Sequence, residues 1–292
     1  MPTKGKRRAL GQHFLINKSI IKLIADCAIN EAIKHGCQTI LEIGPGKGAL
    51  TIPMLERLVP QTQLDGCNDK AIRQIILCER DAKLLSELND KFSVVGAKNH
   101  NVKIIKHQCD FLDLPETSWV SSMPITVVSN LPYSAATAIL NKLARYPDKI
   151  AAMILMFQAE VAKRLRAPAG TKAHGSLSVW TQNTWEVTKI IQVTPKNFSP
   201  PPEVDSEVVL LTPLATAHVN ISNNEKASML WECLLKGCFA HKRKMLRSAL
   251  AGNKNFQIAL DLSHVDGTKR AEALEWDEWD KLFEAFMAVS AN

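Results

Sequence analysis

Residues 40–51 read ILEIGPGKGALT, a pattern typical of the first strand, turn and helix of an α/β fold. An apolar strand runs into Gly44, Gly46 and Gly48 and then into a helical pattern. Glycines at a strand-to-helix turn let the main chain come close to a ligand, and the N–H groups at the start of the helix point at that ligand. Read as G-x-G-x-x-A through Ala49, the same turn also fits a nicotinamide-binding fingerprint.

Glu42 stands two residues before the first glycine and helps to choose between these ligands. Dinucleotide sites carry apolar residues at this point of the strand. A carboxylate instead suits a ligand with an ammonium group, such as the methionine end of S-adenosylmethionine. The plain alternative is that Glu42 is a solvent-exposed strand end.

Apolar runs alternate with helix-like segments on both sides of this turn. Such a βα pattern predicts a mostly parallel sheet with helices on both faces, which is a Rossmann-like α/β fold. The seven expected strands cover residues 39–43, 74–79, 102–107, 125–129, 150–156, 185–193 and 206–211. Three consecutive prolines within residues 197–205 predict a rigid, extended loop before the last strand.

The texture of the sequence changes after Leu214, where a polar linker leads into helical periods. We therefore expect two domains, one over residues 1–214 and a small all-helical one over residues 215–292. An apolar stripe at helical spacing is expected to form the core of the second domain rather than a base-stacking surface. The stripe consists of Trp276, Trp279, Leu282, Phe283 and Phe286.

Two further acidic residues follow expected strands. Glu79 ends the second strand, where a carboxylate can accept both ribose hydroxyls of an adenosyl cofactor. It lies 35 residues after Gly44, whereas about 20 are usual, so we interpret residues 59–71 as an inserted surface loop. Asp65 has nearly the usual offset but stands in a turn. Asp110 follows the third strand and could accept from the adenine amino group, or simply form a turn.

The charge distribution favours a polyanionic partner. The net charge is +7, and residues 1–22 and 236–260 contain basic residues but no acidic ones. Residues 261–292 are rich in acids and should not face a phosphate backbone. Two solvated faces are the alternative explanation. The candidate RNA-binding residues are Lys4, Lys6, Arg7, Arg8, Lys242, Arg243, Lys244 and Arg247. We expect residues 239–250 to form one helix that presents Arg243 and Arg247 together.

Several classes of protein are disfavoured. Hydrophobic residues make up 46% of the chain and no apolar run approaches a membrane span, so we expect a globular protein outside the membrane. Seven cysteines form no CxxC pair, which fits reduced thiols in a cytoplasmic protein. The histidines are scattered, so no metal is expected. The N-terminus lacks an apolar signal core, and a motif at residues 12–15 leaves little room for a transit peptide.

Taken together, these segments resemble the bacterial small-subunit rRNA adenine dimethyltransferases, the KsgA family, to which the Erm resistance methylases are related. The resemblance covers nearly the whole chain. It rests on residues 11–15, 42–51, 109–114, 130–133, 175–179, 198–209, 239–250 and 269–279. The chain departs from the family in the insertion before Glu79 and in Arg80, where the family usually has an apolar residue. Both departures lie beside the expected ribose contact.

The resemblance implies a class I methyltransferase domain, S-adenosylmethionine as cofactor, and dimethylation of two adjacent adenosines near the 3′ end of 16S rRNA. The implied partner is an immature 30S particle, and a monomer is the default. The resemblance places along the cofactor Gln12, His13, Leu15, Glu42, Gly44, Gly46, Glu79, Asp110, Phe111 and Asn130. The implied catalytic residues are Asn130, Leu131, Pro132, Tyr133 and Phe198, with Phe198 stacking on the target adenine opposite Tyr133.

The sequence NLPY at residues 130–133 suits methylation of an exocyclic amine, whose lone pair is delocalised into the ring. The Asn130 side-chain oxygen and the Leu131 carbonyl would accept both N–H bonds and draw the nitrogen toward a tetrahedral shape. Pro132 fixes the direction of the chain. Tyr133 offers a face for the extruded base, worth roughly 1–3 kcal/mol. Read without context, Asn-x-Pro is only a turn signal.

Three other functions are open. One is a ribosome-assembly factor that binds and releases an immature subunit. Another is a DNA or protein amino-methyltransferase, although Leu131 stands where related sites carry proline. A nicotinamide dehydrogenase comes last, because no hydride acceptor site is evident.

Overall fold

The computed structural model describes residues 13–58, 72–96, 102–120, 124–221 and 225–290, which form two compact units. The first unit comprises residues up to 162 together with 187–213, and the second comprises 163–186 together with the chain from 214 onward. The expectations for Lys4, Lys6, Arg7, Arg8, Gln12 and the insertion 59–71 lie outside the described residues.

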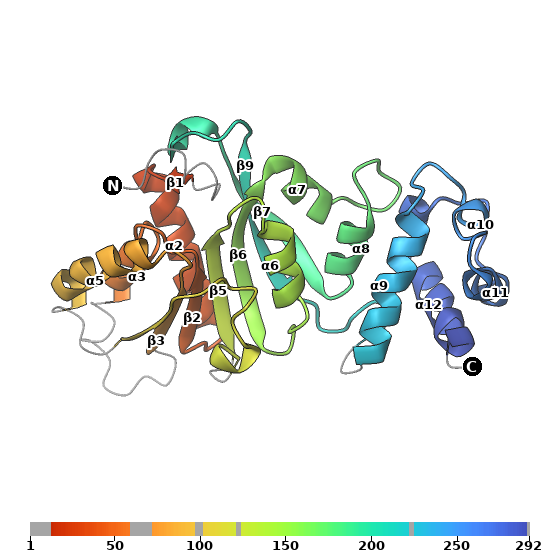
Figure 1. Ribbon diagram of the computed structural model, residues 1–292, viewed down its shortest axis with the longest axis horizontal. Helices are drawn as coiled ribbons and strands as arrows, with labels where there is room; N and C mark the ends of the chain where they lie inside the picture. Colours follow the sequence, from red (N-terminus) through yellow and green to blue (C-terminus); the bar gives the residue numbers. More distant parts are fainter. Residues whose placement is uncertain (1–12, 59–71, 97–101, 121–123, 222–224, 291–292) are drawn as a thin grey trace. The chain divides into compact units, whose positions relative to one another are not determined.

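A seven-stranded, mostly parallel sheet organises the first unit (Figure 1), as the sequence predicts. Strands β2 to β6 run parallel to one another, and β9 pairs antiparallel with β6. In spatial order the strands are β4 (Lys103–His107), β3 (Gln74–Cys78), β2 (Thr39–Ile43), β5 (Ile125–Asn130), β6 (Ile150–Gln158), β9 (Ser206–Pro213) and β7 (Trp185–Val193). Strand β2 and its parallel neighbours β3 and β5 therefore end at one edge of the sheet, where a site can form.

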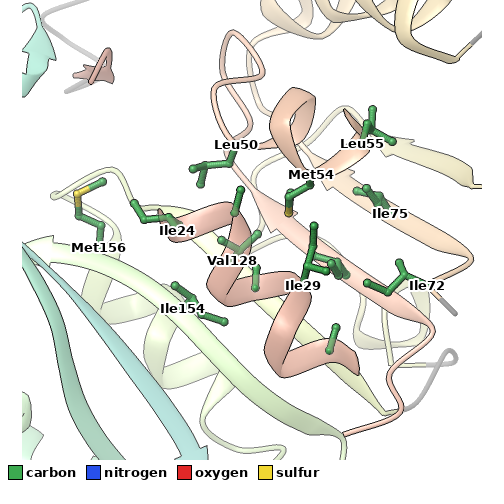
Figure 2. Close-up of a cluster of buried hydrophobic side chains, with 14 of the residues drawn as sticks. Ile24, Ile29, Leu50, Met54, Leu55, Ile72, Ile75, Val128, Ile154 and Met156 are labelled. Carbon is green, nitrogen blue, oxygen red and sulfur yellow. The ribbon is translucent and has the colours of Figure 1, made fainter. Parts of the chain in front are cut away.

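Helices of the first unit cover the sheet. They are α2 (Lys18–Lys34), α3 (Thr51–Leu58), α5 (Ala82–Gly96), α6 (Ala136–Leu143) and α7 (Ala159–Leu165), of which α7 continues into the second unit. The side chain of Asn17 accepts from the N–H groups of Ser19 and Ile20 and so starts α2. Figure 2 shows side chains of α2 and α3, such as Ile29 and Met54, packed over the strands.

Both faces of the sheet are covered. Ile40 and Val128 belong to the cluster that packs against α2 and α3. Their chain neighbours Leu41 and Val127 are also fully buried. Because successive side chains of a strand point to opposite faces, this pattern requires cover on both sides.

A short two-stranded sheet, which the sequence does not predict, joins the N-terminal segment to the proline-rich one. Strand β1 (Phe14–Leu15) pairs antiparallel with β8 (Phe198–Ser199), and the pairing sets Leu15 opposite Phe198. The expected extended loop over residues 197–205 thus contains a strand, preceded by the short turn η2 (Pro195–Asn197).

Helices make up the second unit. They are α8 (Ser176–Gln182), α9 (Glu225–Phe239), α10 (Leu246–Ala249), α11 (Lys254–Ser263) and α12 (Trp276–Ser290), with a short turn η3 (Ala271–Ala273). Trp279, Leu282, Phe283 and Phe286 are buried in its core, so this part of the predicted stripe is confirmed as core, while Trp276 packs at its margin. None of the described helices is long and apolar enough to cross a membrane.

Two expectations about this region were wrong. The segment 163–186, whose last two residues begin β7, belongs to the second unit rather than to the first, because Val179 and Trp180 of α8 pack into the helical core. Residues 239–250 do not form one helix. The N–H groups of Leu246 and Arg247 donate to the carbonyls of Lys269 and Gly267, and this pairing replaces the helical hydrogen bonds between α9 and α10.

Candidate functional site

A pocket of about 360 Å³ lies at the carboxyl ends of β2, β3 and β5. Its size is in the range of small-ligand sites. Twelve of the residues predicted from the sequence line it. They are His13, Leu15, Glu42, Gly44, Gly46, Glu79, Asp110, Phe111, Asn130, Leu131, Pro132 and Tyr133. The fold therefore brings together segments that are up to 120 residues apart in the chain.

The glycine turn, residues 44–48, forms one wall of the pocket. Gly46 has a φ of +57°, and a Cβ at this position would lie 3.1 Å from a ring carbon of Phe14. Only glycine combines this backbone conformation with so close a neighbour. The turn is anchored to β3, because the Gly44 N–H donates to the Cys78 carbonyl. A ligand against this wall of the pocket therefore faces main chain rather than side chains.

Glu79 links the end of β3 to the glycine turn. Its Oε2 accepts from the Gly46 N–H at 3.0 Å, and its Oε1 accepts from the Asp81 N–H at 2.8 Å. Burial raises the pKa of Glu79, while these two backbone donors act in the opposite direction. Two fixed oxygens at the pocket wall can still accept from a pair of neighbouring hydroxyls, because a carboxylate offers about four lone-pair sites.

Glu42 is 2% exposed, so the alternative of a solvent-exposed strand end is wrong. Its Oε2 accepts from the Thr51 hydroxyl at 2.6 Å. Burial raises the pKa of Glu42 to about 8, the Thr51 hydrogen bond lowers it, and the charge of Glu79 raises it further. A buried carboxyl group of this kind gains from a cationic partner, which would favour its ionised form.

Asp110 and Phe111 begin a loop over residues 110–114, which we call the adenine-side loop after the group that the sequence leads us to expect there. Asp110 Oδ1 accepts from the Leu112 N–H at 3.0 Å, and its Oδ2 lies 3.5 Å from the Arg80 guanidinium. Phe111 is buried beside Trp119. The plain reading of Asp110 as a turn-former is thus correct, and its carboxylate also lines the pocket.

Asn130 occupies the last position of β5, and its Nδ2 donates to the His13 carbonyl at 3.0 Å. This bond orients the amide, because the NH₂ group is turned to the protein and the oxygen is left to accept from a ligand. Leu131 and Pro132 follow and also line the pocket. The Asn-x-Pro turn therefore brings the Asn130 amide and Leu131 to the pocket at the end of β5.

Tyr133 is held on two sides. The His13 ring stacks on it with a centroid distance of 5.7 Å and an interplanar angle of 27°. The Tyr133 hydroxyl forms a hydrogen bond with Ser206 Oγ, and the Ser206 residue is fully buried. One face of the Tyr133 ring therefore has an aromatic neighbour. Sequence reasoning missed Ser206, because nothing in a strand pattern shows which residue a distant tyrosine will contact.

Phe198 is the one described member of the predicted site that does not line the pocket. It is 3% exposed and belongs to the apolar core beneath β8. Its stacking on a target base stays a prediction.

The pocket also contains residues that the sequence did not single out. Phe14, Cys78 and Cys109 line it, and the sulfur atoms of Cys78 and Cys109 are 3.8 Å apart. Phe14 stands between His13 and Leu15, so only its neighbours gave a signal. Among the described residues no group of three or more His, Cys, Asp or Glu side chains is arranged to hold a metal ion.

The second unit carries four of the candidate RNA-binding residues. Lys242, Arg243, Lys244 and Arg247 are all exposed. Lys242 Nζ donates to the Lys172 carbonyl at 2.9 Å, which ties the loop after α9 to the segment before α8.

Comparison with known proteins agrees with this geometry. The family model described as ribosomal RNA adenine dimethylase matches residues 3–288. Ribosomal RNA small subunit methyltransferase A of Dichelobacter nodosus is 35% identical and covers 98% of this chain and 97% of its own. The protein of the same name from Geobacter sulfurreducens is 33% identical, with the same two shares of 98% and 97%.

Two solved structures show the same fold. The dimethyladenosine transferase of Plasmodium falciparum has a TM-score of 0.68 at 24% identity and covers 95% of this chain and 98% of its own. The 23S rRNA methyltransferase ErmE has a TM-score of 0.60 at 23% identity, with 94% and 99% covered. The expected Rossmann-like methyltransferase fold with a helical C-terminal region is thereby confirmed.

Proposed function

Because the chain belongs to the ribosomal RNA adenine dimethylase family, we infer that it is a methyltransferase that modifies small-subunit rRNA with S-adenosylmethionine as methyl donor. We propose that it dimethylates N6 of two adjacent adenosines near the 3′ end of 16S rRNA. The observation that carries the proposal is the position of Asn130. Its amide lies in the same pocket as the glycine turn, and the His13 carbonyl holds its NH₂ group.

The lining of the pocket fits the methyl donor. The glycine turn leaves room for a ligand against main chain, and the buried carboxyl group of Glu42 would bind the ammonium group, whose charge favours the ionised form of the carboxyl. Glu79 would accept from the ribose hydroxyls and Asp110 from the adenine amino group. When bound, S-adenosylmethionine supplies a methyl group on a sulfonium, which is already a strong electrophile. The protein therefore contributes mainly alignment for in-line displacement.

Asn130 and Leu131 would activate the target amine. The Asn130 Oδ1 and the Leu131 carbonyl accept one N–H bond each, which directs the nitrogen lone pair away from the ring and toward the methyl group. Once methylated, the nitrogen becomes acidic, so its proton can pass to water and no dedicated base is needed. A second methylation requires that the monomethylated amine keeps one N–H bond that an acceptor can hold.

Tyr133 would stack on the extruded adenine. Because His13 lies on one face of its ring, the base takes the other face, and such stacking is worth roughly 1–3 kcal/mol per base. Bases that react must leave the helix stack or belong to a single-stranded segment.

The finer features of the substrate complex are part of the same proposal. Residues 215–292 would contribute the RNA-binding domain, with phosphate contacts from Lys242, Arg243, Lys244 and Arg247. These four side chains are exposed, so their charges are accessible to phosphate groups. The partner would be an immature 30S particle in the cytoplasm, bound by a monomer.

The test is incubation with methyl-labelled S-adenosylmethionine and unmethylated small subunits, followed by nucleoside analysis of the rRNA. We expect N6,N6-dimethyladenosine from the parent protein. Asn130→Ala should lose at least a hundredfold in rate while it retains rRNA binding, since it removes a transition-state contact. Retained methylation would refute the role of Asn130. Absence of product in the parent protein, with cofactor binding intact, would favour the assembly-factor function.

A further inference from the structure

Lys142 ties the helix that follows the NLPY turn to the adenine-side loop. It lies near the end of α6, the helix that begins three residues after Tyr133. Its Nζ donates to the carbonyls of Phe111 and Leu112 at 3.0 Å each and to that of Leu114 at 2.6 Å. An ammonium group has three N–H donors, so these three carbonyls use all of them. The side chain is 15% exposed.

The chain of hydrogen bonds continues to Asp110. The Phe111 carbonyl accepts from Lys142, and the N–H of the same peptide group, which belongs to Leu112, donates to Asp110 Oδ1. Lys142 therefore fixes the peptide that orients this carboxylate. The Lys142 ammonium also lies 5.2 Å from the centroid of the Phe111 ring, within the range of a cation–π contact.

The helix that carries Lys142 is packed into the core of the first unit. Ile139, Leu140 and Leu143 of α6 are buried. The Ala135 N–H donates to the Pro132 carbonyl, so the helix follows directly from the NLPY turn. A displacement of the adenine-side loop would have to break three charge-assisted hydrogen bonds to a rigid element.

We propose that Lys142 is a positioning residue that sets the adenine-side loop against the NLPY turn, and thereby holds Asp110 where it selects the adenine amino group of the cofactor. This inference rests on the proposed function, since it takes the pocket to hold an adenosyl ligand. Lys142 itself does not line the pocket, so it acts through Leu112 and Asp110.

The decisive measurement is the preference between two product analogues. S-adenosylhomocysteine carries the amino group that Asp110 would accept, and S-inosylhomocysteine carries an oxygen there instead. Binding of both would be measured by calorimetry on the full chain. Lys142→Met should lower the affinity for S-adenosylhomocysteine about tenfold and the affinity for S-inosylhomocysteine much less, because it removes the donors that orient Asp110. Asp110→Asn should reduce the preference in the same way.

A matched control comes from the same unit. Lys149→Met removes an ammonium group that pairs with the neighbouring Asp148 at 2.9 Å, and it should leave both affinities unchanged. If Lys142→Met does not fold, Lys142→Gln keeps two N–H donors and should show a smaller loss of preference.

Thermal unfolding separates positioning from simple structural support. An unchanged preference in a folded Lys142 variant, with only a lower unfolding temperature, would overturn the inference while the proposed function stands. Failure of the parent protein to bind S-adenosylhomocysteine would instead refute the proposed function, and this inference would fall with it.

Discussion

Replacing Glu42 with glutamine should stabilise the protein at alkaline pH and change little at acidic pH. Burial raises the pKa of Glu42 from 4.5 to about 8. Between these values the folded protein holds a proton on this carboxyl group that the unfolded chain has released. The free energy of unfolding of the parent protein therefore falls as the pH rises through this interval. Glutamine cannot ionise, and its side-chain oxygen can still accept from Thr51.

The size of the effect follows from the width of the interval, since one unit of pKa shift corresponds to about 1.4 kcal/mol. From about pH 5 to about pH 8.5, the difference in unfolding free energy between the variant and the parent protein should grow by the order of 4 kcal/mol. Most surface substitutions change stability by about 0.5 kcal/mol or less, so the signal is distinct. The assay is urea unfolding at both pH values, followed by circular dichroism.

Glu56→Gln is the matched control, because Glu56 is an exposed glutamate on the neighbouring α3. Its unfolding free energy should follow that of the parent protein at both pH values. A Glu42→Gln difference that is equal at the two pH values would refute the reasoning, because it would mean that Glu42 titrates alike in the folded and unfolded chains.

Three further predictions concern packing, the tyrosine and the RNA. Gly48→Ala should lower the unfolding free energy by about 2–4 kcal/mol, since a Cβ would lie 2.6 Å from Leu88 Cδ2 at a φ of +80°. Gly36 also has a positive φ, but a Cβ at this position would have no atom within 4 Å, so Gly36→Ala should lower the unfolding free energy by only about 1–2 kcal/mol. Equal losses for the two variants in urea unfolding would contradict the packing argument. Ser206→Ala and Tyr133→Phe should each destabilise by about 1 kcal/mol, and the double variant by no more than the larger single loss, because both remove one hydrogen bond. Additive losses in the double-mutant cycle would refute that contact. Replacing Arg243 and Arg247 with glutamine should reduce the slope of log binding constant against log salt by about 1.5, whereas Lys281→Gln on the acid-rich α12 should not alter it. An unchanged slope in filter-binding assays would exclude these two arginines from the phosphate contact.

Local patterns in the sequence were enough to predict the sheet and most of the pocket. A buried strand requires an apolar run, and a close turn requires glycine. The strands β2 and β5 and the turn around Gly46 can therefore be recognised from short stretches of sequence. In parallel sheets such strands end at one edge, which is why Glu42, Glu79 and Asn130 could be placed together.

The remaining features depend on residues that are distant in the chain. Phe198 has the same aromatic character wherever it packs, and no local pattern shows that it pairs opposite Leu15 and is buried among core side chains. The sequence likewise could not show that α8 packs with the second unit, because α8 lies between two segments of the sheet unit in the chain.

Neighbouring residues in the chain thus encode the type of fold, the glycine turn and the NLPY motif. The way these groups are held depends on contacts between residues that are far apart in the chain. The His13 carbonyl orients Asn130 across 117 positions, and Lys142 reaches the adenine-side loop across about 30. Those bonds exist because the sheet brings the ends of its strands to one edge, and no local pattern records which distant partners will meet there.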